Sequence, residues 1–139
     1  AVVRTAASWV DSFPYFSRLT GTGSSSRVWV PGPASATMNL FALAHARFVG
    51  AELAATVDEA THAHVTPAGL AACLRDGADL RGRHVVVAGD RLPAALSRRA
   101  VAAGARLSHY YGAAELSFVA WGTSEEDLQA FPGVEIDVR

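Results

Sequence analysis

The chain has 139 residues, which at roughly 100–200 residues per domain predicts one domain spanning 1–139. Hydrophobic residues make up 50% of it and charged residues 18%, a composition too apolar and too weakly charged for a disordered chain. The formal net charge is -1, from 12 basic and 13 acidic residues, so no nucleic-acid partner is expected.

The single cysteine, Cys73, excludes an internal disulfide framework and any zinc site built from several cysteines. We interpret Cys73 as a small core residue on a helix. No apolar run approaches the roughly 18 residues that a membrane span needs, and the N-terminus does not resemble a signal peptide. A cytoplasmic location is therefore predicted. The sequence begins with alanine and contains no lysine, and we expect it to be a processed or excised piece of a longer protein.

The first half of the chain alternates helical and extended patterns. Apolar residues recur at helical spacing before Pro14, and the Pro-Gly-Pro run at 31–33 closes a short apolar strand. The predicted elements are a helix over 1–13 that ends near Pro14, a loop over 21–26, a strand over 28–30, a mostly buried helix over 35–49, and strands over 52–56 and 62–65.

The second half carries stronger local signals. Thr66 followed by Pro67 is a typical helix start, since it combines a hydroxyl cap with proline at the first helical position. The β-branched run 84–88 is typical of a buried parallel strand. The predicted elements are a helix from Pro67 to about Gly77, a strand over 84–88, a helix over 93–104 with Leu96, Ala100 and Val101 facing inward, strands over 107–111 and 116–121, a short helix over 124–128, and a final strand over 134–138.

Strands alternate with helices of ten to fifteen residues, which predicts an α/β domain with a mostly parallel sheet flanked by helices. In such sheets, ligands bind beyond the carboxyl ends of the strands. Two successive strands end in unusual residues, Gly-Asp-Arg at 89–91 and the segment 109–115, and we expect these ends to lie side by side.

These two strand ends can supply the parts of a nucleotide site. A glycine lets a planar ligand or a phosphate approach the backbone, and Tyr110 or Tyr111 offers a flat face for a base. Glu115 offers an oxygen ligand suited to Mg²⁺. The alternative is a pair of ordinary turns with a core tyrosine and a solvated glutamate.

The segment 111–115, Tyr-Gly-Ala-Ala-Glu, resembles the Tyr-Gly-x-Thr-Glu motif of the AMP-forming adenylating enzymes, which include acyl-CoA synthetases and o-succinylbenzoate–CoA ligases. The segment 88–93 is similar to their Gly-Gly-x-x-Leu-Pro turn. Three further segments match in the same order, at 33–40, 61–70 and 131–136. The resemblance covers nearly the whole chain and implies the middle subdomain of the large N-terminal domain of such a ligase.

The resemblance implies a role for each matching residue. Tyr111 would stack on adenine, and Glu115 would ligate the Mg²⁺ of ATP as the catalytic and metal-binding residue. The other implied nucleotide contacts are Gly89, Asp90, Arg91, Tyr110, Gly112, Ala113 and Ala114. The implied border of the acid pocket is formed by the segments 35–40 and 109–112, in particular by Ser35, Ala36, Met38, Asn39 and His109.

The implied reaction has two steps. A carboxylate attacks the α-phosphate of ATP and releases pyrophosphate, and the thiol of CoA then displaces AMP to form a thioester. The implied partners are a small carboxylic acid, the nucleotide and the rest of the ligase chain. The acid would be an acyl or aryl acid, such as a fatty acid, and the small residues Ala34 and Ala36 would leave room for a bulky group.

The sequence departs from the family pattern in two ways that bear on activity. Ala114 stands where the family has threonine, and Ala36 stands where many members carry histidine or another ring. The family's two lysines, one in a phosphate loop and one in a C-terminal domain, have no counterpart in a chain without lysine. We therefore expect no adenylation by this chain alone, and an exposed apolar face would favour self-association.

Two other functions stay open on the sequence. The chain could be a non-catalytic remnant of a ligase that binds a nucleotide or a partner protein, or an unrelated doubly wound domain. Among smaller candidates, the Gly- and Ser-rich stretch 21–26 is interpreted as a surface loop rather than a phosphate cradle. His62 and His64 are interpreted as structural or exposed rather than metal ligands, and the three tryptophans as core residues.

Overall fold

A seven-stranded sheet organises the chain in the computed structural model, which describes residues 5–114 and 116–137. The strands are β1 (Arg27–Trp29), β2 (Glu52–Leu53), β3 (His62–Val65), β4 (His84–Val87), β5 (Arg106–Ala113), β6 (Ser117–Gly122) and β7 (Gln129–Ala130). The helices are α1 (Ala6–Val10), α2 (Phe13–Thr20), α3 (Thr37–Val49), α4 (Pro67–Arg75) and α5 (Ala94–Ala102), with a 3-10 turn η1 (Val57–Glu59).

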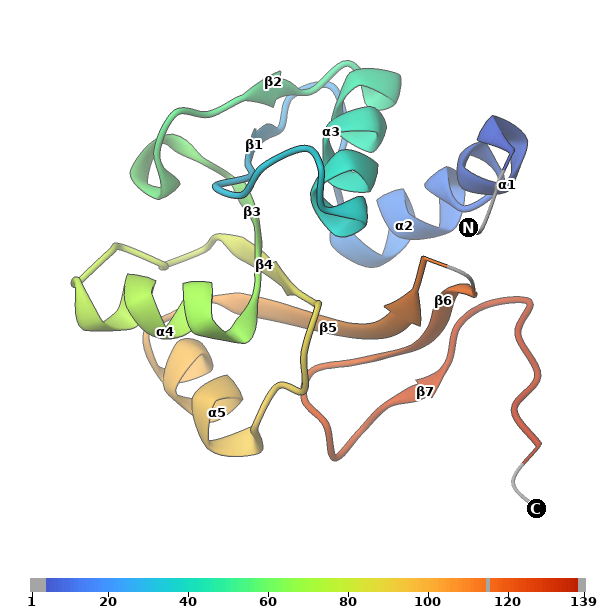
Figure 1. The fold of residues 1–139 in the computed structure, drawn as a ribbon. Helices are drawn as coiled ribbons and strands as arrows, with labels where there is room; N and C mark the ends of the chain where they lie inside the picture. Colours follow the sequence, from blue (N-terminus) through green and yellow to red (C-terminus); the bar gives the residue numbers. More distant parts are fainter. Residues whose placement is uncertain (1–4, 115, 138–139) are drawn as a thin grey trace.

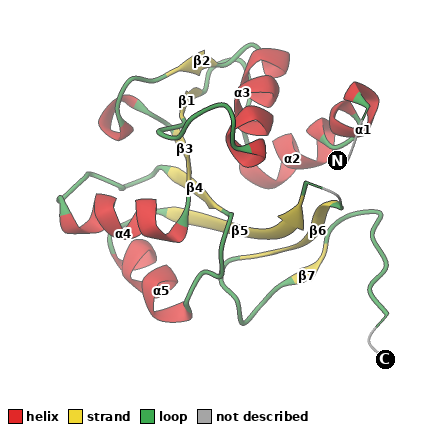
Figure 2. Ribbon diagram, in the orientation of Figure 1, coloured by secondary structure: helices red, strands yellow, loops and turns green. Residues whose placement is uncertain are grey.

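The strand order is β2-β1-β3-β4-β5-β6-β7 (Figure 1). The first five strands in this order run parallel, whereas β5–β6 and β6–β7 pair antiparallel. Helices cover both faces of the sheet, with α2 and α3 on one and α4 and α5 on the other (Figure 2). The predicted α/β fold with a mostly parallel sheet is confirmed.

The two layers of helices create two hydrophobic cores because successive residues of a strand point to opposite faces. In β4, Val85 and Val87 pack with Leu70 of α4 in one core. Val86, between them, packs in the other core with Phe16 of α2. Trp9, Trp29 and Trp121 are partly buried against these cores, as expected.

The strongest local signals of the second half are confirmed. The Thr66 side chain accepts a hydrogen bond from the Gly69 amide at 3.1 Å, and Pro67 opens α4. The four residues of β4 are all buried. Cys73 is a buried residue of α4, and burial raises the pKa of its thiol.

The prediction that a helix ends near Pro14 is wrong. Pro14 lies in the first turn of α2, which begins at Phe13, whereas α1 ends at Val10. A proline in the first helical turn loses no intrahelical hydrogen bond, because its missing amide would have no partner there. Residues 1–4 of the predicted helix lie outside the described residues.

The predictions for the C-terminal segment also need correction. Residues 124–128 form no helix, because the Asp127 carboxylate accepts hydrogen bonds from the Thr123 and Ser124 amides, both at 2.8 Å, and holds a turn. The last strand is β7, since the main chain pairs with β6 at Gln129 and Ala130 rather than over 134–137. Residue 138 lies outside the described residues.

Smaller differences concern elements at the edge of the sheet and on the helix surfaces. The strand predicted over 52–56 is only the edge pair Glu52–Leu53. Val101 of α5 is exposed, contrary to the predicted inward orientation, and so is Phe48 of α3. Within the part of the chain that the structure describes, no helix combines the length and apolar character that crossing a membrane requires.

Candidate functional site

The ends of β4 and β5 lie next to each other in the sheet, with Val87 paired to His109. The His109 ring nitrogen Nδ1 lies 2.9 Å from the Val87 carbonyl oxygen, which ties the two strands together where β4 ends. A cavity of about 240 Å³ opens beyond this point. Its position matches the place where α/β sheets bind ligands, beyond the carboxyl ends of the parallel strands.

The cavity brings together residues from four parts of the sequence. Seven of its lining residues belong to the predicted site or to the predicted pocket segment 35–40, and these are Thr37, Met38, Gly89, Tyr110, Gly112, Ala113 and Ala114. Four more were not predicted to line a site, and these are Trp9, Phe41, Ser117 and Phe118. The prediction that the two strand ends converge is therefore confirmed by the geometry, while the roles of these residues stay predictions.

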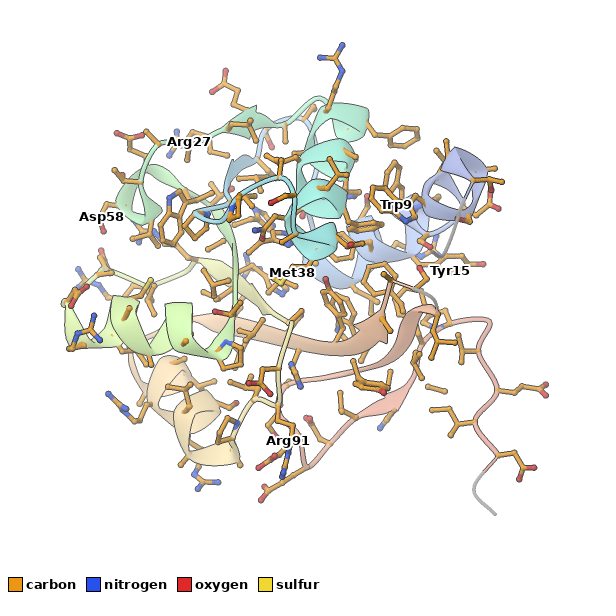
Figure 3. All side chains as sticks on the ribbon, in the orientation of Figure 1. Trp9, Tyr15, Arg27, Met38, Asp58 and Arg91 are labelled. Carbon is orange, nitrogen blue, oxygen red and sulfur yellow. The ribbon has the colours of Figure 1, made fainter. Side chains whose placement is uncertain are left out.

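Gly89 follows the end of β4 and lies close to Met38 in the first turn of α3. It has a φ of +90°, in the left-handed region that favours glycine. A Cβ atom at this position would lie 3.0 Å from the Met38 sulfur, so a side chain would also crowd the cavity wall (Figure 3 shows Met38). Only glycine combines this backbone conformation with so close an approach of α3.

Gly112 lies where the pairing of β5 and β6 shifts register, between Tyr111 and Gly112. The strand predicted to end at residue 111 continues to Ala113, with a β-bulge or similar irregularity at this shift. A Cβ atom at Gly112 would clash with the main-chain carbonyl of Ser117. The close approach of the two strands at the cavity rim therefore depends on glycine.

We expect the substitution Gly112→Ala to lower the free energy of unfolding by roughly 1–3 kcal/mol, because the clash is with backbone and cannot be relieved by a rotamer change. Urea unfolding followed by circular dichroism measures the change. Gly23→Ala is the matched control, since no atom lies within 4 Å of a Cβ there, and it should change stability by less than about 0.5 kcal/mol. Equal losses in the two variants would contradict the clash.

The two adjacent tyrosines of β5 have opposite environments. Tyr110 packs edge-on against Phe118, with ring centroids 4.7 Å apart, and stacks on Trp121 at 5.9 Å. Burial raises the pKa of the Tyr110 phenol, so the side chain is neutral at physiological pH. Tyr111 is 56% exposed, so its ring is not buried in the protein interior. Of the two, Tyr111 is the ring that is open to a ligand from solvent.

Asp90 and Arg91 lie outside the residues that line the cavity. The Arg91 guanidinium forms an ion pair with Glu125, with Nη2 2.7 Å from Oε2. The Asp90 carboxylate accepts a hydrogen bond from the Arg91 amide at 2.7 Å. Figure 3 shows Arg91 directed away from Met38.

Only some of the residues predicted to border the acid pocket line the cavity. Met38 lines it, but Ser35, Ala36, Asn39 and His109 do not. Asn39 is buried and donates from Nδ2 to the Pro33 carbonyl oxygen at 3.0 Å, so its side chain holds the loop that precedes α3.

Glu115, the predicted catalytic and Mg²⁺-binding residue, lies outside the described residues. In residues 5–114 and 116–137, no group of three or more His, Cys, Asp or Glu side chains could hold a metal ion. His62 and His64 are buried in β3, in line with the structural interpretation. The His62 ring nitrogen Nε2 lies 2.9 Å from the Thr20 carbonyl oxygen.

Solved structures with the same fold include a protein described as similar to AMP-forming acyl-CoA synthetases and AMP-acid ligases. E. coli MenE, with a bound analogue of OSB-AMS, matches with a TM-score of 0.82 and 22% identity, over 100% of this chain and 34% of that chain. An acyl-CoA synthetase (AMP-forming)/AMP-acid ligase II-like protein from Dyadobacter fermentans matches with a TM-score of 0.76 and 17% identity, over 97% of this chain and 45% of that one. VinN in complex with L-aspartate matches with a TM-score of 0.72 and 19% identity, over 90% and 38%. No protein-family model and no curated protein sequence matches the chain.

The fold is therefore that of one part of an AMP-forming ligase, and the resemblance expected from the motifs is confirmed at the level of the fold. The chain spans about a third of the length of MenE. At these identities the likeness defines the fold, while the chemistry of this chain depends on its own residues.

Proposed function

We propose that the chain forms the adenine-binding edge and the acid-binding cavity of an AMP-forming acid–CoA ligase, an acyl- or aryl-CoA synthetase. One observation carries this proposal. The ends of β4 and β5 converge on one cavity that Gly89 and the segment Gly112–Ala114 line together, and the exposed Tyr111 follows Tyr110 in β5 without itself lining the cavity. The ligase fold around this cavity supports the same function.

The proposed reaction begins with attack of the substrate carboxylate on the α-phosphate of ATP, which releases pyrophosphate and leaves an acyl-adenylate. The thiol of CoA then attacks the acyl carbon, and AMP leaves. This chain would hold the adenine on Tyr111 and the organic part of the acid in the cavity. Such a reaction depends on positioning the two substrates and on neutralising phosphate charge more than on covalent catalysis by the protein.

Mg²⁺ would neutralise charge on the phosphates of ATP and is the expected metal of this reaction. A site of this kind needs few protein ligands, because Mg²⁺ is commonly held by one or two carboxylates together with substrate phosphates. The absence of a larger acidic cluster among the described residues is compatible with that arrangement. Glu115 stays the proposed ligand on the strength of the sequence motif.

We expect AMP to bind to this chain and the substitution Tyr111→Ala to weaken that binding about tenfold. An aromatic ring stacked on a base contributes roughly 1–3 kcal/mol, and a factor of ten corresponds to about 1.4 kcal/mol. Titration of AMP followed by NMR measures the dissociation constants.

Tyr111→Phe should retain the affinity for AMP, because the ring and not the hydroxyl makes the proposed contact. Tyr15→Ala is the matched control, since Tyr15 is an exposed tyrosine on α2 outside the cavity. Failure of AMP to bind, or unchanged affinity in Tyr111→Ala, would contradict the proposal.

A second candidate function is a nucleotide- or partner-binding module without catalysis. Ala114 favours it, because a methyl group cannot donate the hydrogen bond that the family threonine hydroxyl would give to a phosphate. ATP–pyrophosphate exchange across a panel of carboxylic acids separates the two candidates. We expect no ATP–pyrophosphate exchange by this chain alone. Exchange by a polypeptide that contains this chain together with the rest of a ligase would support the enzymatic function over the non-catalytic module.

The proposed partners are the nucleotide, a small carboxylic acid, CoA as the acceptor, and the remainder of a ligase chain. Exposed apolar side chains on several elements offer surfaces for that remainder or for self-association, among them Phe48, Leu53 and Leu116. A cytoplasmic location stays a prediction.

A further inference from the structure

The cavity has walls made of aromatic rings from four elements. Trp9 of α1 packs edge-on against Phe41 of α3, with centroids 5.7 Å apart, and Phe41 packs edge-on against Phe118 of β6 at 4.8 Å. Phe118 in turn meets Tyr110 of β5. Edge-to-face contacts of this kind hold each ring in a defined orientation. The cavity is therefore a preformed apolar space.

No charged side chain lines the cavity within the described part of the chain. The polar side chains of its lining are the hydroxyls of Thr37, Tyr110 and Ser117. Tyr110 is neutral, because burial raises the pKa of its phenol. A charged group placed in this space would lose its hydration without meeting an opposite charge, and such a loss costs several kcal/mol.

The volume of about 240 Å³ limits what the cavity can hold. A dry cavity of about 150 Å³ lined by aliphatic and aromatic side chains is known to bind benzene. The larger cavity of this chain therefore has room for a benzene ring with a short substituent.

On the basis of the proposed function, we propose that the acid substrate is a monocarboxylic acid whose remainder is an uncharged apolar group about the size of a substituted benzene ring. The aromatic walls hold that group, and the cavity discriminates against acids that carry a second charge at the far end. The single carboxylate stays outside the aromatic walls, where the nucleotide reacts with it.

A matched pair of acids tests this inference. Phenylpropionate and para-carboxyphenylpropionate differ only in the second carboxylate. We expect the dicarboxylate to bind at least about tenfold more weakly, since an unpaired charge in the cavity costs more than the roughly 1.4 kcal/mol that this factor represents. Fluorotryptophan labelling of the chain gives an NMR signal for each of its three tryptophans.

The signals of Trp9 and Trp29 separate binding in the cavity from non-specific effects. Trp9 lines the cavity, whereas Trp29 packs in the core on the other face of the sheet. Phenylpropionate should shift the Trp9 signal to saturation and leave Trp29 unchanged. No saturable shift of Trp9, equal affinity for the two acids, or tighter binding of the dicarboxylate would overturn the inference.

Two substitutions at the exposed Thr37 test the electrostatic cause. Thr37→Arg places a cation at the rim and should raise the affinity for the dicarboxylate, while Thr37→Leu should leave the preference for phenylpropionate in place. If Thr37→Arg fails to reduce the discrimination, the electrostatic cause is overturned. A parallel titration with AMP separates this inference from the proposed function. If phenylpropionate binds and AMP does not, the proposed nucleotide site is refuted, while the inference about the cavity is retained.

Discussion

The substitution Phe16→Ala should lower the free energy of unfolding by about 3–5 kcal/mol, the usual range for removing a buried phenylalanine ring. Phe16 is 0% exposed and lies at the centre of the core between α2, α3 and the sheet. Its ring centroid is 5.2 Å from that of Phe41 and 5.7 Å from that of Phe118. A loss of this size is a large part of the roughly 5–15 kcal/mol by which a domain is stable.

Chemical denaturation of wild-type and variant chains measures this effect. Leu19→Ala is the matched control, because Leu19 is an exposed residue of the same helix, and it should cost less than about 1 kcal/mol. Phe16→Leu keeps a folded chain but leaves space behind Phe41 and Phe118, so it should weaken phenylpropionate binding in the cavity. A loss below about 1 kcal/mol in Phe16→Ala would show that this core is not closely packed.

The chain should also lose stability when the pH falls from about 6.5 to 4, because buried histidines must be neutral in the folded state. Burial lowers the pKa of His45 to about 4, that of His64 to about 3 and that of His84 to about 4. The same cause lowers the pKa of His62. Neighbouring histidines lower the pKa of His64 further, and His62 and His84 stack with ring centroids 5.8 Å apart.

The sign follows from proton binding. Below the unfolded pKa of about 6.5 the unfolded chain takes up protons that the folded chain does not, so acid favours unfolding. Each such histidine can contribute up to about 1.4 kcal/mol per pH unit between its folded pKa and 6.5, and stability is fully present above this window. The lowered pKa of Asp79, caused by hydrogen bonds from Arg81, acts only below about pH 4 and does not interfere.

Urea unfolding at several pH values from 8 to 4 measures the dependence. His64→Phe, which replaces the imidazole stacked on Phe16 at 5.4 Å with an uncharged ring, should make the slope between pH 6 and 4 shallower. The effect of the variant on stability at pH 8 serves as the reference, since the four histidines with a lowered pKa are neutral there. A free energy of unfolding that is constant from pH 7 to 5 would refute the prediction.

Local chemistry made several elements predictable. The cap and proline at Thr66–Pro67 and the β-branched run of β4 act through near neighbours in the chain, and both are confirmed. Pro14 does not by itself determine a helix boundary, because a proline can either end a helix or open one, and only the packing of Phe13 and Phe16 in the core decides between them. The segment 124–128 has acidic residues where the first turn of a helix favours them, which predicts a helix, but the Asp127 carboxylate instead binds the amides that precede it.

The convergence of the β4 and β5 ends could be predicted, because the carboxyl ends of parallel strands meet at one edge of a sheet. The residues that line the cavity could not all be predicted from the sequence. Trp9 and Phe118 look like core residues in the sequence, and only the pairing of β6 beside β5 brings Phe118 to the cavity. The sequence predicts the strand over 116–121 but not its antiparallel pairing with the strand before it, for which the short glycine-containing connection between the two predicted strands is the signal.

The sequence by itself determined the α/β order of elements, the family-like motifs and the absence of lysine. The tertiary structure decided which of the adjacent tyrosines faces the interior and which faces solvent. Successive residues of a strand point to opposite faces, so Tyr110 enters the aromatic wall while Tyr111 stays open. Which face is buried depends on how α2 and α3 pack, and that is a property of contacts between residues far apart in the chain.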